Sequence, residues 1–413
     1  MTTRPPDRPT AGPSARQRWV FALTLFALSL ALLIPSLAPT VTLWDAGEFL
    51  AASKVSGIPH PPGTPLWVMV AHTWATLIPF GTWAFRVILM TAVAGAAATA
   101  CLGLVAWEAL RRVPALGEGE LPSWLVPAGA MAAAIAGSFT FTNWQNSNET
   151  EVYAIAMLAI AITLWLLYRW REQRGTPQAD RTLLLILYLA GLSIGNHLLA
   201  LLVGPAVVAF LWLVARAEPL GDAAERSREL ATTAVMAGTW LLLIGLGLGS
   251  TMLSLLGGAA FLVAALWAAT HRRAAFVGVG LVVALIGITT YLYLYIRAGQ
   301  HPMINEAQPD NWHALLDVIR RKQYPVRTPF DDPTVLHGPG NPGRSFLMMG
   351  LQLVNYFQYF FWQWGYTFGN GLGRVPFAML WHERFRVDAA HAWARGVVFA
   401  AIRRRLQRGG DGA

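Results

Sequence analysis

The chain has 413 residues, of which 55% are hydrophobic and only 13% are charged. Soluble domains carry about 25% charged residues, so this composition excludes an ordinary water-soluble globular protein. The formal net charge of +9 raises nucleic acid as a partner, but the arginines gather at the ends of apolar segments, where cytoplasmic flanks of membrane helices carry them. We therefore expect membrane lipids, and no nucleic acid, as partners. The single cysteine, Cys101, excludes an intrachain disulfide and a cysteine-based zinc site.

Long apolar segments predict a protein that crosses the membrane many times, because roughly 18 to 20 such residues span the hydrocarbon. Residues 1–18 form a basic arm, and Arg16 and Arg18 directly before the first apolar segment place this arm in the cytoplasm. Applied from Arg111 and Arg112 onward, the same rule places the ends of the remaining segments alternately in the cytoplasm and on the outer side. The transmembrane core then covers residues 19–297, with spans near 19–38, 86–110, 123–141, 152–168, 182–194, 198–215, 231–249, 251–270 and 275–296.

Two long loops fall on the outer side in this topology. The first covers residues 39–85 and contains 65–80, a stretch too short for a span that predicts an amphipathic helix on the outer surface. The second covers residues 298–345. Residues 346–413 combine an aromatic segment up to 368, which is either a tenth span or an interfacial helix, with a basic cytoplasmic tail. The predicted fold class is an all-α polytopic transmembrane bundle with nine or ten spans.

The unusual polar residues share one side of this topology. They fall at or near the outer ends of the spans: Asp45, Glu48, His60, Asn143, Glu149, Glu151, Asn196, His197, Glu306 and Asp310. Ionisable groups are costly at membrane depth and are rare there without a function. This one-sided cluster predicts a functional site on the outer side.

Asp45 and Glu48 are three residues apart, so both carboxylates lie on one face if the segment after Trp44 is helical. Such acids either cap the start of the helix or act as a catalytic base or ligand. His60 begins the rigid turn His60-Pro61-Pro62-Gly63, and its ring either donates to a phosphate oxygen or satisfies a backbone carbonyl. The residues by themselves leave both pairs of alternatives open.

Two further groups of candidates lie in short outer loops. Asn196 and His197 meet at the hairpin between two apolar spans, where an imidazole binds an anionic headgroup or the pair simply stabilises the turn. Glu149 and Glu151 either contact sugar hydroxyls or a metal, or are only solvated. With the acids of the first loop they could ligate a divalent cation, but oxygen ligands alone do not identify one, so no metal is assigned. No Walker A, GxGxxG, HExxH or GxSxG motif occurs, which leaves soluble nucleotide chemistry unsupported.

Several motifs follow one another in a fixed order along roughly residues 40 to 330. They are Trp44-Asp45-Ala46-Gly47-Glu48-Phe49, Gly57-Ile58-Pro59-His60-Pro61-Pro62-Gly63-Thr64-Pro65-Leu66, Glu151-Val152-Tyr153, Gly191-Leu192-Ser193-Ile194-Gly195-Asn196-His197, Asn305-Glu306 with Pro309, and Arg321-Lys322-Gln323-Tyr324. This ordered set resembles the protein O-mannosyltransferase-like family that includes the eukaryotic transmembrane O-mannosyltransferase of plexin-type receptors and many bacterial members.

The resemblance implies a GT-C-type membrane glycosyltransferase with surface helices in its first outer loop. Such an enzyme moves a sugar, here with mannose as the candidate, from a polyprenyl-phosphate donor to an acceptor hydroxyl on a protein, a glycan or a lipid. Asp45 matches the position of the family's base, and Glu48 would tune or orient it. His60, His197 or Arg86 would hold the donor phosphate.

The implied substrate-binding set is completed by Glu149, Glu151, Tyr153, Asn196 and Glu306. The expected location is a bacterial inner (plasma) membrane, with the amino terminus in the cytoplasm and the active site outside. Two alternatives stay open. One is a non-catalytic protein that binds or transports a lipid-linked sugar. The other is an inactive, truncated homologue, because relatives usually continue beyond about residue 370 with further spans or a soluble region.

Overall fold

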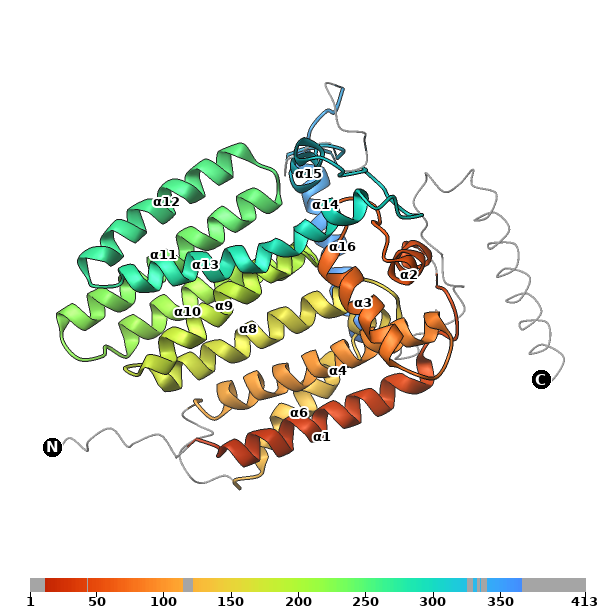
Figure 1. Cartoon of the computed structure of the whole chain (residues 1–413). Helices are drawn as coiled ribbons and strands as arrows, with labels where there is room; N and C mark the ends of the chain where they lie inside the picture. Colours follow the sequence, from red (N-terminus) through yellow and green to blue (C-terminus); the bar gives the residue numbers. More distant parts are fainter. Residues whose placement is uncertain are drawn as a thin grey trace. The chain divides into compact units, whose positions relative to one another are not determined.

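The computed structural model describes residues 12–42, 44–113, 122–324, 330–332, 335 and 340–365. Within these ranges the chain folds into helices joined by turns and loops, as Figure 1 shows, and contains no β-strand. One isolated parallel bridge joins Ile58 to Asn305. The all-α class is therefore confirmed. Residues 1–11 of the predicted basic arm and 366–413 of the predicted tail lie outside the described residues.

The chain divides into two compact units, residues 1–355 and residues 356–413. The candidate site lies in the first unit. Of the second, only the part up to Gly365 is described, and it completes helix α16 (Phe346–Gly365). This helix is not among those apolar enough to cross a membrane, because glutamine and asparagine side chains interrupt it. Its assignment as a tenth span or an interfacial helix stays a prediction.

Seven helices of the described chain are long and apolar enough to cross a bilayer, which takes roughly 20 residues at 1.5 Å per residue. They are α1 (Ala15–Leu33, extended by a 3-10 turn to Ser36), α4 (Trp83–Leu110), α8 (Tyr153–Gln173), α10 (Gly204–Ala217, preceded by the 3-10 segment Leu198–Val203), α11 (Ala223–Gly247), α12 (Thr251–Thr270), and α13 (Ala274–Ile288), which continues through Thr289–Tyr291 into α14 (Leu292–Ala298). The protein is therefore an integral membrane protein.

Two further elements explain why this number is lower than the nine or ten spans expected. Helices α6 (Leu125–Ser138) and α7 (Phe141–Asn148) meet at 68° and make an eighth span only if they are taken together. Helix α9 (Pro177–Ile194) packs along α8 and α13 but begins with charged residues such as Asp180. Many of its apolar residues, Ile186 among them, belong to the protein core and are covered by neighbouring helices, whereas Leu185 is exposed. The described chain thus supplies seven or eight spans by length and apolarity.

Glycines bring two pairs of helices into backbone contact. A Cβ atom at Gly191 on α9 would lie 2.3 Å from the carbonyl oxygen of Ala284 on α13. A Cβ atom at Gly245 on α11 would lie 2.5 Å from the backbone nitrogen of Ser254 on α12. Small residues commonly allow membrane helices to approach this closely. The close α9–α13 packing fixes the end of α9 that leads into the Asn196-His197 turn.

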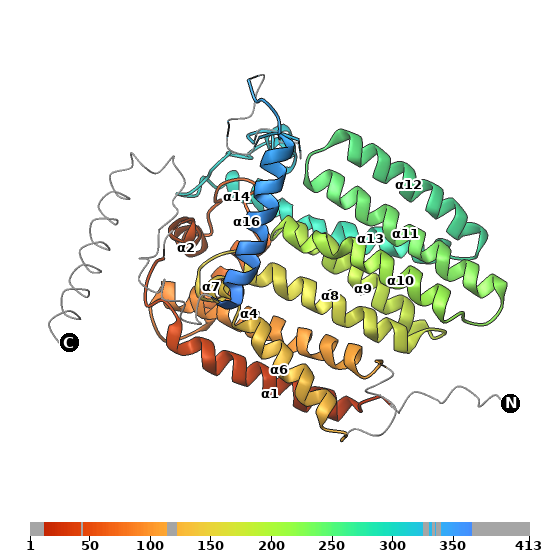
Figure 2. The same ribbon diagram turned by 180° about the vertical axis from the view of Figure 1, so that it is seen from behind.

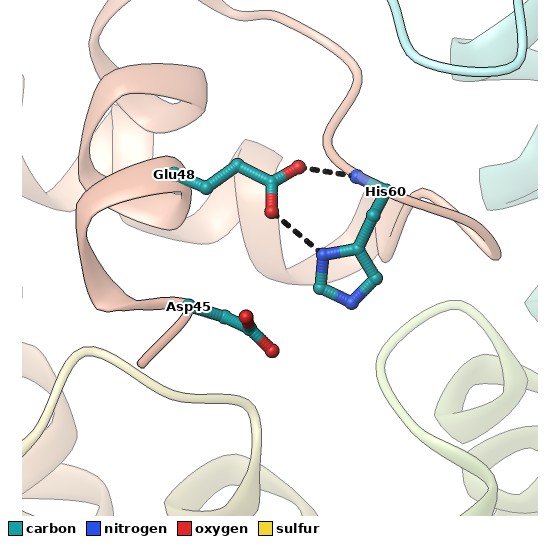
Figure 3. A group of neighbouring side chains, drawn as sticks. All are labelled: Asp45, Glu48 and His60. Carbon is teal, nitrogen blue, oxygen red and sulfur yellow. Dashed lines mark hydrogen bonds and ion pairs between the residues drawn. The ribbon is translucent and has the colours of Figure 1, made fainter. Parts of the chain in front are cut away.

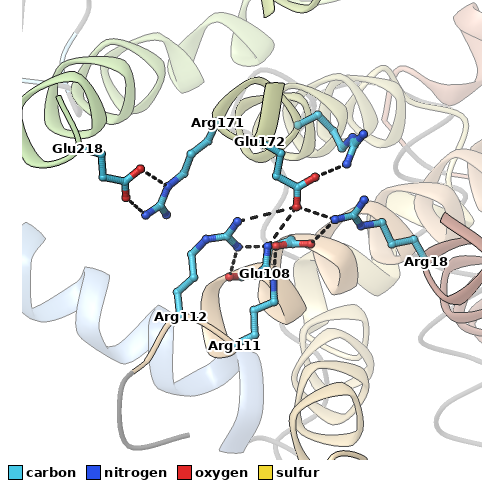
Figure 4. A network of polar contacts seen from close by, with 8 residues as sticks. Arg18, Glu108, Arg111, Arg112, Arg171, Glu172 and Glu218 are labelled. Atoms are coloured by element: carbon cyan, nitrogen blue, oxygen red, sulfur yellow. Dashed lines mark hydrogen bonds and ion pairs between the residues drawn. The ribbon is translucent and has the colours of Figure 1, made fainter. Parts of the chain in front are cut away.

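Ion pairs gather where α1 begins and where α4 and α8 end (Figure 4). The Nη2 atom of Arg18 lies 3.2 Å from Oε1 of Glu108 and 2.5 Å from Oε1 of Glu172. Arg111 and Arg112 both contact Glu108, and Nη2 of Arg111 lies 3.1 Å from Glu172. We call these five residues the basic end. They join the start of α1 to the ends of α4 and α8, as the alternating arginine pattern predicts. The side of the membrane on which they lie stays a prediction.

The loop between α1 and α4 carries two helices, α2 (Ala46–Val55) and α3 (Pro65–Leu77). Seen from behind, α2 and α7 lie at the end of the first unit away from the start of α1 (Figure 2). The predicted helix at 65–80 is therefore present, but it is not simply a surface helix. Trp67 and Val68 are fully buried against α2 and α4. Helix α3 instead forms part of the wall of the site.

Candidate functional site

Asp45 stands at the start of α2 but does not cap it. The preceding Trp44 has a φ of +67°, a left-handed conformation that is rare and strained for a bulky residue. Asp45 itself has helical dihedral angles and no side-chain capping bond, whereas a capping residue normally has an extended backbone. The interpretation of Asp45 and Glu48 as a helix cap is therefore wrong. The half-buried Asp45 carboxylate lies beside Glu48 and His60, and no hydrogen bond or ion pair joins it to either residue (Figure 3).

Glu48 binds His60 twice (Figure 3). Its Oε1 atom accepts the backbone N–H of His60 at 2.5 Å, and its Oε2 atom lies 2.7 Å from Nδ1 of the His60 ring. Burial acts to raise the pKa of Glu48, but the hydrogen bonds from His60 outweigh it and hold that pKa below its ordinary value. The hydrogen bond to Glu48 raises the pKa of His60, against the opposing effect of burial. The two residues thus favour a carboxylate–imidazolium pair, in which Nε2 of His60 is a second donor.

The loop after α14, which the sequence predicts as the second outer loop, pairs with the loop between α1 and α4. The backbone N–H of Ile58 donates to the carbonyl of Ile304 at 2.8 Å, and the N–H of Glu306 donates to the carbonyl of Ile58 at 3.0 Å. This short pairing carries Glu306 next to Glu48. Burial and the negative charge of Glu48 raise the pKa of Glu306. The structure therefore brings Glu48 and Glu306 together from distant parts of the sequence.

Glu151 is buried, with 7% of its surface exposed, and the backbone around it is held on both sides. The indole N–H of Trp67 donates to its carbonyl at 3.1 Å, and the side-chain amide of Asn196 donates to the carbonyl of Val152 at 3.1 Å. Burial and the negative charge of Asp45 raise the pKa of Glu151 to about 8. Asn196 is thus a structural partner of this loop. We call Asp45, Glu48, His60, Glu151 and Glu306 the acidic end.

The other polar residues of this region have local partners. Gln145 donates to the carboxylate of Glu149 at 2.9 Å, and burial raises the pKa of Glu149. The side-chain amide of Asn143 donates to the carbonyl of Ser138 at 3.2 Å, which closes the bend between α6 and α7. Asp310 is exposed. Asn143 and Asp310 therefore stand outside the acidic end.

His197 has a defined tautomer. Its Nδ1 atom accepts the backbone N–H of Leu199 at 3.1 Å, so the ring hydrogen lies on Nε2. Burial, with a smaller effect of the positive charge of Arg321, lowers the pKa of His197 to about 4. The ring is therefore neutral at neutral pH. Tyr153 meets it edge-on, with ring centroids 5.4 Å apart. His197 thus offers one fixed, uncharged N–H donor.

Arg321 is a site residue to which the sequence analysis assigns no role. It follows α15 (Trp312–Ile319), and its half-buried side chain lies near His197, Tyr291 and Tyr324. No acid among the described residues pairs with it, and burial lowers the pKa of its guanidinium. A half-buried cation without a counter-charge is costly for the fold and is typical of an anion-binding site. A sequence signal exists, because the positive-inside rule disfavours the run Arg320-Arg321-Lys322 in a loop predicted outside.

Tyr324 ties the Arg321 segment to the acidic end. Its hydroxyl donates to the carbonyl of Pro61 at 2.7 Å, within the turn that begins at His60. Burial raises the pKa of this hydroxyl most, and the negative charges of Glu48 and Asp45 raise it further. The basic group and the acids therefore border one region of the molecule.

Arg86 lies in a different setting from the other predicted phosphate ligands. Its guanidinium donates to the carbonyls of Ala75 at 3.0 Å, Phe80 at 3.0 Å and Gly81 at 3.1 Å. These bonds close the turn between α3 and α4. Arg86 therefore stabilises the turn between α3 and α4, and we do not place it in the candidate site.

Asp45, Glu48 and His60 also meet the geometric requirement for a metal site. One potential ligand atom of each lies within 4.8 Å of the others. The Nδ1 atom of His60 is already engaged by Glu48, so Nε2 is the ring nitrogen left for a metal. The Glu48–His60 contact is the interaction that the structure shows within this group.

Comparisons with known proteins assign a family resemblance to part of the chain. Residues 45–221 match the family model described as the Protein O-mannosyl-transferase TMEM260 N-terminal domain. A relative from Mus musculus, Protein O-mannosyl-transferase TMEM260, is 28% identical over 187 residues, which make up 45% of this chain and 25% of the relative. The chain thus spans about a quarter of the length of this curated relative. No solved structure matches the chain significantly.

The matched range begins at Asp45 and includes Glu48, His60, Glu151 and His197. The resemblance to an O-mannosyltransferase-like family is therefore confirmed over this part of the chain. The loop after α14, with Glu306 and Arg321, lies beyond the matched range and contacts it only in the folded structure.

Proposed function

We propose that this protein is a GT-C-type membrane glycosyltransferase that moves a sugar from a polyprenyl-phosphate donor to an acceptor hydroxyl. One observation carries the proposal: Asp45, a carboxylate that forms no ion pair with any of the described residues, borders the same region as two donors suited to phosphate, His197 and Arg321. A base without a partner beside an anion site suits a reaction between a lipid-borne phosphate and a hydroxyl. The name of the mouse relative makes mannose the first sugar to test.

Asp45 is the base in this proposal. Its carboxylate accepts the proton of the acceptor hydroxyl while the hydroxyl oxygen attacks the anomeric carbon of the sugar. The bond from that carbon to the phosphate oxygen breaks, and polyprenyl phosphate leaves with the bonding electrons. Direct displacement inverts the anomeric centre. Because Asp45 does not cap α2, its carboxylate is available for this proton.

Arg321 and His197 hold the phosphate. The leaving phosphate gains negative charge in the transition state, and a guanidinium together with a neutral N–H donor stabilises that charge without solvent reorganisation. The neutral ring of His197 retains its Nε2 hydrogen at neutral pH. Glu48 and His60 orient the start of the site through their double contact.

The site faces the outer side of a bacterial inner membrane in this proposal, and the donor enters from the lipid. The arginine-rich basic end then lies on the cytoplasmic side, as the positive-inside rule favours. The acceptor is a protein, a glycan or a lipid hydroxyl exposed on the outer side.

A transfer assay with Asp45→Asn tests the proposal. Purified protein in nanodiscs receives polyprenyl-phosphate mannose labelled in the sugar, with a periplasmic protein extract as acceptor. Labelled protein and released polyprenyl phosphate are the products measured. Loss of a general base lowers the rate by roughly 10²–10⁴-fold, so Asp45→Asn is expected to fall by that factor. The matched control is Asp310→Asn, which removes one exposed acid from the second outer loop and should retain full turnover.

The assay tests both the role of Asp45 and the alternative function. Wild-type turnover that survives Asp45→Asn would remove Asp45 from the role of base. Donor binding by the wild type without any product, over a range of sugars and acceptors, would favour the alternative of a protein that binds or transports a lipid-linked sugar.

A further inference from the structure

Glu151 is the most buried acid of the acidic end, and the mechanism above does not use it. Its residue surface is 7% exposed, and no cationic side chain of the described residues forms an ion pair with it. The groups whose charges reach it are the acids Asp45 and Glu149 and the ring of His60, and the backbone amide of Val152 supplies one hydrogen bond. Two negative neighbours and burial all oppose a negative charge at this position.

The fold prevents Glu151 from escaping to water. Its own carbonyl accepts the indole N–H of the fully buried Trp67 at 3.1 Å. The next residue, Val152, belongs to a buried cluster with Phe49 of α2 and Trp67 of α3, and its carbonyl is bound by Asn196 at 3.1 Å. These contacts fix the backbone from which the Glu151 carboxyl group extends. Protonation of the carboxyl group reduces the electrostatic cost of this position.

We propose that Glu151 works as a neutral carboxylic acid that positions the reaction beside Asp45 by donating a hydrogen bond, and that its ionisation switches transfer off. This inference rests on the proposed glycosyl transfer. In the neutral form Glu151 adds an O–H donor to a site otherwise rich in acceptors. In the ionised form it loses this donor and adds a second negative charge near Asp45, which repels an anionic donor.

The titration range follows from the same environment. Burial first, and then the charges of Asp45 and Glu149, raise the pKa of Glu151 to about 8. A carboxyl group with this pKa is protonated at neutral pH and loses its proton as the pH rises above about 8. The transfer activity should therefore have an alkaline limb in this range.

The first experiment measures kcat/KM against pH, with polyprenyl-phosphate mannose as the probe donor, for the wild type, Glu151→Gln and Asp310→Asn. Glutamine has the shape of the neutral acid and keeps an N–H donor, but it cannot ionise. Each profile is normalised to its own maximum. Wild type and Asp310→Asn should fall above about pH 8, approaching tenfold per pH unit, and the Glu151→Gln profile should stay flat there. Glu151→Ala lacks the donor and should lose activity at every pH.

A Glu151→Gln profile with the same alkaline limb as the wild type would overturn the inference. So would a well-folded Glu151→Gln that is inactive at every pH while Glu151→Asp retains transfer, because that result would mean the negative charge is needed. Both results require an active wild type, so they leave the proposed function standing.

A second experiment needs no activity. Infrared difference spectra of the membrane-embedded protein report the C=O stretch of protonated carboxyl groups. The wild type should show a component that disappears as the pH rises through about 8, and Glu151→Gln should lack it, whereas Asp310→Asn should keep it. Absence of this component from the wild type would overturn the inference even if transfer is never detected. Its presence in an inactive wild type would support the neutral form of Glu151 while the proposed function failed.

Discussion

The two ends of the first unit hold their charges in opposite ways. At the basic end, Arg18, Arg111 and Arg112 each contact Glu108, and Glu172 adds further contacts (Figure 4). At the acidic end, the imidazole of His60 is the one basic side chain among the five residues, and of the four carboxyl groups only Glu48 pairs with it (Figure 3). The charged side chains of the basic end therefore contact oppositely charged partners, whereas most carboxyl groups of the acidic end form no ion pair with the described residues.

This difference separates structural charges from functional ones. Paired buried charges fix the spacing of the helices that carry them, and loss of one partner leaves the other uncompensated. Unpaired charges make the fold less stable, and proteins retain them mainly where a substrate or a proton uses them. Charge density alone therefore does not identify the site; the missing partners do.

The largest effect on stability is expected from breaking the basic end. Glu108 is 1% exposed and contacts three arginines, so Glu108→Gln leaves a buried positive cluster without its central acid. The expected loss is about 3–5 kcal/mol in the free energy of unfolding. Thermal unfolding in nanodiscs measures it, and transfer per folded molecule should stay unchanged. The exposed Glu218, which pairs with Arg171, is the matched control and should cost less than about 1 kcal/mol when changed to Gln. An equal loss in both variants would contradict the contrast between the ends.

An intermediate effect is expected at the unpaired cation. Arg321→Ala removes charge-assisted hydrogen bonds to the donor phosphate, which are worth roughly 1.5–3 kcal/mol and correspond to about 10- to 100-fold in donor affinity. Binding of polyprenyl phosphate to the purified protein measures this directly. Arg320→Ala removes the neighbouring exposed charge and should change affinity less than about twofold. Equal losses in the two variants would indicate general attraction of the lipid, and no loss in either would remove Arg321 from the phosphate site.

The smallest effect is expected from the one ion pair of the acidic end. The pKa of Glu48 is held below its ordinary value of 4.5, so its contribution to stability is present above 4.5 and is lost as the pH falls through the lowered value. The pKa of His60 is raised above 6.5, so its contribution is complete below 6.5 and is lost as the pH rises through the raised value. The pair should therefore stabilise the protein most between pH 4.5 and 6.5.

Glu48→Gln tests this window. Both side chains are partly exposed to solvent, so we expect the variant to lower the unfolding temperature by only about 1–2 °C inside the window and by less above it. Melting curves at pH 5, 6, 7 and 8 measure the difference. A loss that grows steadily toward alkaline pH would contradict the ion pair.

The sequence determined the main apolar helices and their order, because hydropathy and flanking arginines are properties of each short segment and need no knowledge of the tertiary contacts. The segment predicted at 251–270 is α12 with the same bounds, and the one predicted at 86–110 lies within α4. The preference of polar residues for one side also followed from local patterns, and it placed Asp45, Glu48 and Glu151 among the candidates.

Only the tertiary structure decided which of these residues act on one another. Glu48 binds His60 across 12 residues instead of capping its own helix, because the chain turns back after α2 through the left-handed Ser56. Tyr324 binds the carbonyl of Pro61 across 263 residues and carries Arg321 to the site, and no local pattern encodes that contact. Whether a charge has a partner depends on packing between distant segments. That packing separates the saturated basic end from the acidic end, where the chemistry is proposed.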